Sequence, residues 1–145
     1  YQTEVFEVHQ IDQINTQYQP IAAQKELLLQ QFIPEILTLG ETSLIFFNKQ
    51  FSHAVNKTPK AGDFRIQVQF GGTYAGIEPS PDLIRQAQKA VDTFEGKLLY
   101  ARVDGIVIGD QLQLMEIECI EPDLYFGYSD GAQHRFVDAI PELIR

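Results

Sequence analysis

The chain has 145 residues and a mass of 16.5 kDa, and its 44% hydrophobic content is enough for one buried core. Its 20 acidic against 11 basic residues give a net charge of -9, which argues against a nucleic-acid partner because contacts to phosphate rest on Lys and Arg. The single cysteine, Cys119, excludes a disulfide framework and no apolar run approaches the ~20 residues of a membrane span, so we expect a cytoplasmic protein without a membrane partner.

The first half of the chain predicts a helix followed by strands. Residues 10–24 are predicted to be helical, although Pro20 should interrupt any single helix. A polar, turn-prone stretch at 57–62 is expected to form a mobile loop. β-Branched and aromatic residues predict three strands, at 42–48, 51–56 and 64–70.

Two further helices are predicted in the second half. Ser80 suits an N-cap and Pro81 a first helical position, so a helix should begin there and end at Gly96. A last helix is predicted at 130–140, before Pro141. Its residues expected to point inward are Phe136, Val137 and Ile140.

Between these helices the sequence predicts a β-hairpin. The β-rich runs 98–108 and 112–120 are joined by Gly-Asp-Gln at 109–111, a hairpin signature. A two-residue turn would set Asp104 opposite Met115. A three-residue loop would instead predict these pairs: Ile108 with Leu112, Asp104 with Glu116, and Arg102 with Glu118.

Three acidic residues of this hairpin indicate a metal site. Glu116 and Glu118 are two residues apart, so both project to one face of their strand. With the three-residue loop, Asp104 joins them, and three converging carboxylates repel one another unless a hard cation such as Mg²⁺ or Mn²⁺ is bound. The alternatives are a solvated acidic edge or an ordinary pair of Arg102 with Glu118.

Taken together, the elements predict an α+β domain with an antiparallel sheet and flanking helices. The order of its short motifs resembles the C-terminal half of an ATP-grasp domain, closest to the glutathione synthetase branch. The motifs are Gln31-Phe-Ile-Pro-Glu-Ile, Gly40-Glu41, Gly62-Asp-Phe-Arg65, Gly71-Gly72, Asp104, and Glu116-Ile-Glu118 with Pro122. The resemblance implies that residues 1–145 are a single partial ATP-grasp domain. The phosphate-gripping lysines and glycine-rich loop of the family lie upstream of this part, so alone it should be inactive.

The resemblance also implies a nucleotide site. The backbone of Gln31, Phe32 and Ile33 would read adenine, as the hinge of the family does. Glu41 would accept hydrogen bonds from the ribose hydroxyls. Arg65 would contact the triphosphate and act in catalysis, a task that suits its planar cationic fork.

The metal positions of the family fall on Asp104, Glu116 and Glu118, and Glu116 would bridge two ions. Glu118 stands where the family has Asn, which adds a negative charge. Further candidates for holding phosphate or an anionic substrate are Lys57, Lys60 and Arg102.

The reaction that the resemblance implies is ligation of a small-molecule carboxylate to an amine or thiol through an acylphosphate, with ATP and Mg²⁺ or Mn²⁺. Catalysis would then be mostly positioning and electrostatics. Two alternatives remain: a non-catalytic ATP-grasp-like nucleotide-binding domain, and a metal-dependent nuclease of the restriction-endonuclease type. The net charge and the presence of Glu rather than Lys at position 118 oppose the nuclease.

Overall fold

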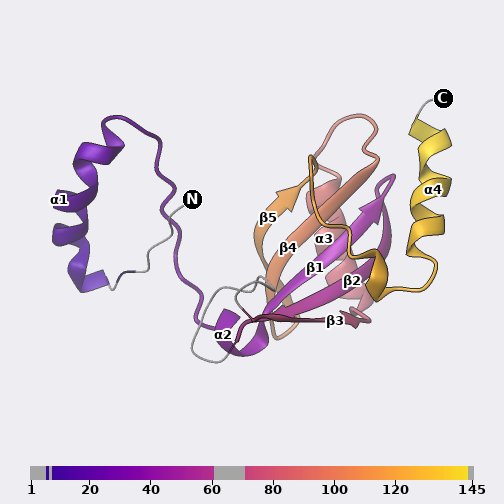
Figure 1. The fold of residues 1–145 in the computed structure, drawn as a ribbon, viewed down its shortest axis with the longest axis horizontal. Helices are drawn as coiled ribbons and strands as arrows, with labels where there is room; N and C mark the ends of the chain where they lie inside the picture. Colours follow the sequence, from indigo (N-terminus) through magenta and orange to yellow (C-terminus); the bar gives the residue numbers. More distant parts are fainter. Residues whose placement is uncertain (1–5, 7, 61–70, 144–145) are drawn as a thin grey trace. The chain divides into compact units, whose positions relative to one another are not determined.

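A five-stranded antiparallel sheet organises the part of the chain that carries the candidate site (Figure 1). The computed structural model describes residue 6 and residues 8–60 and 71–143. The strands are β1 (Glu41–Phe47), β2 (Gln50–Thr58), β3 (Thr73–Ile77), β4 (Tyr100–Ile108) and β5 (Gln111–Glu118). Their order is β3-β2-β1-β4-β5, and all neighbours are antiparallel. The predicted α+β class with flanking helices is therefore confirmed.

The chain divides into two compact units, Tyr1–Ile33 and Pro34–Arg145. The first unit contains η1 (Val8–Gln10) and α1 (Ile11–Ala22). The predicted interruption of α1 is wrong, because Pro20 lies inside the helix in its last turn, where only one backbone hydrogen bond is lost. The second unit contains the sheet with α2 (Ile36–Leu39), α3 (Pro81–Val91), η3 (Phe126–Tyr128) and α4 (Ala132–Leu143).

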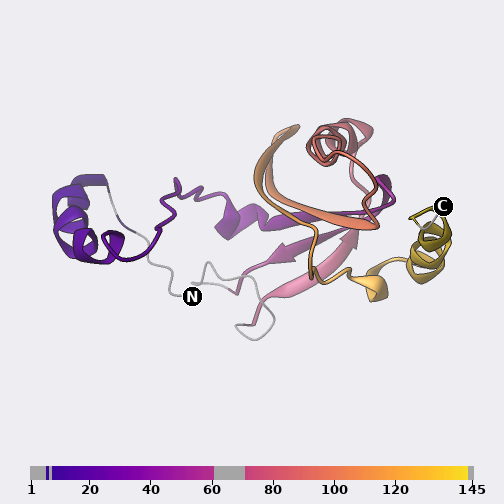
Figure 2. The same cartoon turned by 90° about the horizontal axis from the view of Figure 1, so that it is seen from above.

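The two faces of the sheet are covered differently, as Figure 2 shows from above. Helix α3 covers one face, where its buried side chains pack on β1 and β4. The other face packs against α4 and the segment 124–126. The first core consists of Leu44, Phe46, Ala54, Leu83, Ala87, Val91, Ala101 and Val103, and the second of Ile45, Phe47, Val55, Tyr125 and Ala139.

Strand β2 is longer than predicted. It extends to Thr58, so Lys57 belongs to the sheet and not to a mobile loop. The reason is its pairing with β1, in which Lys57 lies opposite Glu41. Strand β3 was not predicted, because its short sequence carries Ala75 and Gly76 where a strand favours branched side chains. The strand predicted at 64–70 lies outside the described residues.

The β4–β5 hairpin has the predicted pairs near the candidate site but not the predicted turn. Ile108 pairs with Gln111, so the turn has two residues, and Gly109 supplies the positive φ of +60° that such a turn requires. The register then shifts, because Gly105 pairs with Leu114 but Asp104 with Glu116. Met115 is therefore the extra residue of a β-bulge.

The side chain of Gln86 holds this turn against α3. Its Nε2 donates to the Asp110 carbonyl at 2.7 Å, and its Oε1 accepts the Leu112 N–H at 2.9 Å. These two bonds favour the short turn over the longer loop that the sequence predicted.

The predicted helices are present with shifted ends and faces. Ser80 Oγ accepts the Leu83 N–H at 3.2 Å, which confirms the N-cap of α3, but the helix ends at Val91, before Gly96.

In α4, Phe136 packs into the second core as predicted. Val137 is 59% exposed and Ile140 is 38% exposed, so their predicted inward placement is wrong. Over residues 132–141 of this helix, Ala132 and Ala139 are buried, because small side chains allow it to approach the sheet closely.

Next to the bulge, we expect the stability of the fold to be sensitive to substitution of Gly105. A Cβ on this residue would lie 2.6 Å from the Gln113 carbonyl oxygen, so we expect Gly105→Ala to lower the free energy of unfolding by about 2 kcal/mol. Gly127→Ala is the matched control, because its Cβ would meet nothing within 4 Å, and it should change stability by less than about 0.5 kcal/mol. Urea unfolding checks both values, and equal midpoints for the two variants would contradict the close approach.

Candidate functional site

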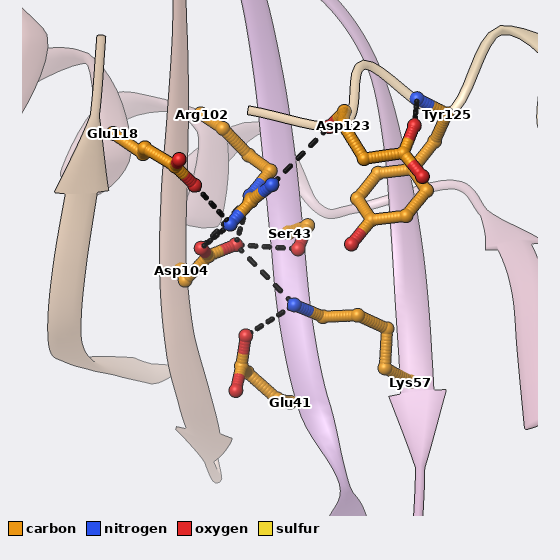
Figure 3. A network of polar contacts seen from close by, with 8 residues as sticks. All are labelled: Glu41, Ser43, Lys57, Arg102, Asp104, Glu118, Asp123 and Tyr125. Carbon is orange, nitrogen blue, oxygen red and sulfur yellow. Dashed lines mark hydrogen bonds and ion pairs between the residues drawn. The ribbon is translucent and has the colours of Figure 1, made fainter. Parts of the chain in front are cut away.

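A network of charged and polar side chains lies on the face of the sheet that carries the second core (Figure 3). Its side chains come from four strands and from the segment after β5. Three ionisable members are almost completely buried, Asp104 at 1%, Lys57 at 3% and Glu41 at 8% exposure. The network consists of Glu41, Ser43, Lys57, Arg102, Asp104, Glu118, Asp123 and Tyr125.

Asp104 is the centre of this network. Ser43 lies opposite it across β1 and β4, and the Ser43 hydroxyl donates to Oδ1 at 2.5 Å. Arg102 is two residues away on the same strand face, and its Nε donates to both carboxylate oxygens at 3.0 and 2.8 Å. Lys57 Nζ lies 3.6 Å from Oδ1. Two cations and a hydroxyl therefore compensate one buried carboxylate.

Arg102 joins the two carboxylates of β4 and β5. Its Nη2 lies 2.8 Å from Asp104 Oδ2 and 2.6 Å from Glu118 Oε2, and its Nη1 donates to the Asp123 carbonyl at 3.3 Å. Burial alone would lower the pKa of Arg102, but the charge and hydrogen bonds of Asp104, with a contribution from Glu118, raise it. The guanidinium is therefore a permanent positive charge between two carboxylates.

Lys57 and Glu41 form a second buried ion pair at the next edge of the network. Burial raises the pKa of the Glu41 carboxyl, and the neighbouring Lys57 partly offsets that rise. The predicted ribose contact of Glu41 stays a prediction, and the described carboxylate is engaged with Lys57.

Tyr125 closes the network from the side of the second core. Its backbone is left-handed, with φ 49° and ψ 39°, and Asp123 Oδ1 accepts its N–H at 2.9 Å. Lys57 Nζ and the Arg102 Cζ each lie 5.7 Å from the centre of its ring, within the range of a cation–π contact. Burial raises the pKa of the Tyr125 hydroxyl to about 12, so the phenol is neutral. The sequence did not indicate that Tyr125 belongs to the network. A tyrosine with positive φ is uncommon, so the backbone conformation of this residue was not expected.

The predicted metal residues share one face of β4 and β5 but differ in their surroundings. Asp104 lies opposite Glu116, and Arg102 opposite Glu118, as the sequence predicted. Glu116 is exposed, whereas Asp104 and Glu118 both contact Arg102. Within residues 8–60 and 71–143, no three His, Cys, Asp or Glu side chains are placed to hold an ion. The oxygen donors suit Mg²⁺ or Mn²⁺, but Arg102 is the cation that Asp104 and Glu118 contact.

The remaining predicted residues belong to the first unit, to the end of β2, or to the part of the chain that the structure does not describe. Gln31, Phe32 and Ile33 belong to the first unit, in a stretch without helix or strand. Arg65 is not among the described residues. Lys60 is exposed beyond the end of β2. Their roles toward adenine and phosphate stay predictions.

A cavity of about 590 Å³ lies beside the sheet next to His53 and Tyr128. His53 is 5% exposed, and its Nε2 lies 2.9 Å from the Leu124 carbonyl oxygen. Its Nδ1 lies 2.9 Å from Ser52 Oγ. Burial lowers the pKa of His53, and the nearby Arg135 adds to the shift. His53 is therefore a neutral strand side chain that ties β2 to the segment after β5.

Solved structures share this fold. The D-cycloserine synthetase DcsG is similar with a TM-score of 0.62 and 24% identity, over 80% of this chain and 42% of its own. The D-alanine–D-alanine ligase from Bacillus anthracis complexed with ATP is similar with a TM-score of 0.56 and 18% identity, over 96% of this chain and 47% of its own. A second structure of that ligase has a TM-score of 0.52 and 14% identity, over 92% and 47%.

The chain has the fold of an ATP-grasp subdomain. It spans less than half the length of each of these enzymes. No protein-family model and no curated protein matches the sequence. Among the described residues, no helix has the length and apolar character that crossing a membrane requires.

Because the ion pair of Lys57 and Glu41 is buried, removing one partner should lower the stability of the fold strongly. Lys57→Met leaves Glu41 without its cation, so the free energy of unfolding should fall by about 3 kcal/mol. Adding Glu41→Leu to that variant should recover at least half of the loss. The control is Arg85→Met, which removes the exposed pair with Asp82 and should cost less than about 1 kcal/mol. Urea denaturation measures all three, and equal losses for Lys57→Met and Arg85→Met would contradict the burial of the pair.

The lowered pKa of His53 predicts a loss of stability in mild acid. The unfolded chain takes up a proton at this residue near the ordinary pKa of 6.5, whereas the native state resists it. The unfolded state therefore binds more protons, and stability is retained above pH 6.5 and lost as the pH falls toward the native pKa. His53→Gln should make the stability less dependent on pH, and urea midpoints measured at pH values below 6.5 check this. His134→Gln is the control, because His134 is exposed and the slope should remain.

Proposed function

We propose that this chain is the metal- and phosphate-facing part of an ATP-dependent ligase that joins a carboxylate to an amine or thiol through an acylphosphate. One observation supports the proposal most directly: an ATP-grasp sheet gathers Lys57, Arg102, Asp104 and Glu118 on a single face. The D-alanine–D-alanine ligase of similar fold is described as a complex with ATP.

The charges of the site suit a divalent ion. Two cations, Lys57 and Arg102, face the carboxylates of Glu41, Asp104 and Glu118 in the network, and exposed Glu116 lies on the same face next to them. With Asp123 and Glu116 included, five carboxylates stand against two cations, and this excess of negative charge would be reduced by one bound Mg²⁺ or Mn²⁺.

In the proposed site, Asp104, Glu116 and Glu118 would hold the ion, and the ion would withdraw charge from the terminal phosphates of ATP. A substrate carboxylate oxygen attacks the γ-phosphorus, the bond to the β-phosphate oxygen breaks, and ADP leaves. The amine or thiol then attacks the acyl carbon of the acylphosphate and loses a proton, and the bond from that carbon to the phosphate oxygen breaks to release inorganic phosphate. In this proposal the chain's residues would contribute by positioning charge, and no protein nucleophile is needed.

The roles of the other residues follow the same proposal. Gln31, Phe32 and Ile33 would read adenine, Glu41 the ribose, and Arg65 the triphosphate. Glu41 must then exchange its contact with Lys57, at least in part, for the ribose hydroxyls. The acid and amine are small molecules, and the rest of the enzyme would supply the other side of the nucleotide site.

A non-catalytic nucleotide-binding domain is the second candidate. It is favoured by the pairing of Arg102 with both Asp104 and Glu118, which compensates these carboxylates without an ion. Calorimetric titration of the intact protein with a non-hydrolysable ATP analogue, with and without Mg²⁺, separates the cases. Binding without any ADP release across a screen of amino acids and small peptides would favour this candidate, and no binding would eliminate the ligase.

Glu116→Gln tests the ligase directly. Because Glu116 is exposed, the variant should keep its folding stability, while ADP release should fall at least about 100-fold through loss of transition-state charge stabilisation. Glu121→Gln is the control, since this exposed residue lies beyond β5 and should retain full activity. A Glu116→Gln variant with the turnover of the unmodified protein would contradict the assignment.

A further inference from the structure

We propose that the hydroxyl of Tyr125 donates a hydrogen bond to an anionic oxygen of the substrates. The acceptor is an oxygen of the γ-phosphoryl group of ATP or of the carboxylate that receives this group. This inference rests on the proposed function, because it concerns ligands of the same charged network. It adds a residue that contacts the substrate directly.

The hydroxyl of Tyr125 lies at the network without a partner of its own. The residue is 7% exposed, and its ring packs in the second core. In Figure 3 the phenol oxygen is turned toward the charged side chains of the sheet. Among the residues that the structure describes, this hydroxyl has no hydrogen-bond partner, although the N–H of Tyr125 has one. A polar group on so buried a tyrosine needs a partner, and a ligand would supply it.

The backbone of Tyr125 supports this role independently. Its left-handed conformation, with φ 49° and ψ 39°, is costly for a residue with a large side chain. Asp123 sustains it, because its Oδ1 accepts the Tyr125 N–H at 2.9 Å while its carbonyl accepts from Arg102 Nη1 at 3.3 Å. Strained backbone positions of this kind cluster at ligand-binding sites. The strain here accompanies the placement of a phenol beside Arg102.

The other donors of the network already have acceptors within it. They are the Lys57 ammonium with Glu41, the Arg102 nitrogens with Asp104, Glu118 and the Asp123 carbonyl, and the Ser43 hydroxyl with Asp104. Among the donor groups of these described side chains, the Tyr125 phenol is therefore the one left without an acceptor.

The chemistry of the phenol favours an anionic acceptor. Burial raises the pKa of the Tyr125 hydroxyl to about 12, so the group keeps its proton and acts as a neutral donor. Hydrogen bonds to anionic oxygens are stronger than those between neutral groups. Lys57 Nζ and Arg102 Cζ each lie 5.7 Å from the ring centre, so positive charge is close to the position of the acceptor.

The charge balance of the network favours a ligand that is also held by its other groups. Three carboxylates contact the two cations, so a small free anion would gain little attraction there. Inorganic phosphate alone should therefore bind weakly. The γ-phosphoryl group of a nucleotide and the carboxylate of a larger acid differ, because the rest of each molecule contributes to binding.

The first test removes the hydroxyl and keeps the ring against its two cations, through Tyr125→Phe. A non-hydrolysable ATP analogue and ADP are titrated into the intact protein by calorimetry. If the acceptor is a γ-phosphoryl oxygen, the variant should bind the analogue at least about tenfold more weakly and ADP unchanged. If the acceptor is the substrate carboxylate, both nucleotides should bind unchanged, and the KM of the acid in the ADP-release assay should rise at least about tenfold.

Tyr128→Phe is the matched control. It makes the same chemical change at a neighbouring tyrosine that is 42% exposed, and it should leave both affinities and the KM unchanged. Tyr125→Phe should also keep the urea midpoint of the unmodified protein, because the hydroxyl has no partner to lose. A clearly lower midpoint would assign the hydroxyl a structural partner and overturn the inference.

The outcomes separate the inference from the proposed function. Equal affinities and equal KM for the unmodified protein and Tyr125→Phe, together with normal ADP release, would overturn the inference alone. Failure of the unmodified protein to bind either nucleotide would overturn the inference together with the nucleotide part of the proposed function.

A second measurement observes the hydroxyl in the unmodified protein. The ¹³Cζ signal of labelled Tyr125, assigned by its absence in Tyr125→Phe, responds to hydrogen bonding at the phenol oxygen. The saturating ligand that supplies the acceptor, the ATP analogue or the acid, should shift this signal, whereas ADP and inorganic phosphate should not. Bound analogue and bound acid that both leave the signal unchanged would contradict the proposed contact.

Discussion

The burial of one carboxylate, that of Asp104, is the constraint on which the unit Pro34–Arg145 depends. An ionised group at 1% exposure is stable only with close partners, and Ser43, Lys57 and Arg102 supply them from three strands. A slip of any of these strands by one residue would turn its side chain to the opposite face. The register of the sheet and the geometry of the site are therefore fixed by the same contacts.

The two faces of the sheet differ in polarity. The α3 face is an apolar core, whereas the opposite face carries a small apolar core next to the charged network. Tyr125 belongs to both, since its ring packs in that core and also faces Lys57 and Arg102. Packing of the C-terminal segment thus holds the two cations in place, which links the stability of this face to the arrangement of its charges.

Sequence reasoning predicted the sheet class and the cap at Ser80, because periodicity and local capping chemistry depend on neighbouring residues. The predicted pair of Asp104 with Glu116 is present for a different reason, since the bulge offsets the shorter turn. It did not predict that Lys57 is a buried strand residue, since that depends on a partner sixteen positions away. The left-handed backbone of Tyr125 could not be predicted either, because tertiary packing sustains it. The adenine and triphosphate roles remain predictions, because they concern the first unit and Arg65.

The bulge at Met115 separates the hairpin into two parts that can vary independently. The turn at Gly109 and Asp110 alone would set Asp104 opposite Met115, but the extra residue restores the pairing with Glu116. During divergence, a one-residue insertion at the tip could be absorbed by loss of the bulge, leaving the acidic pairs unmoved. Related chains with different hairpin lengths can therefore keep identical chemistry at the base of the same two strands.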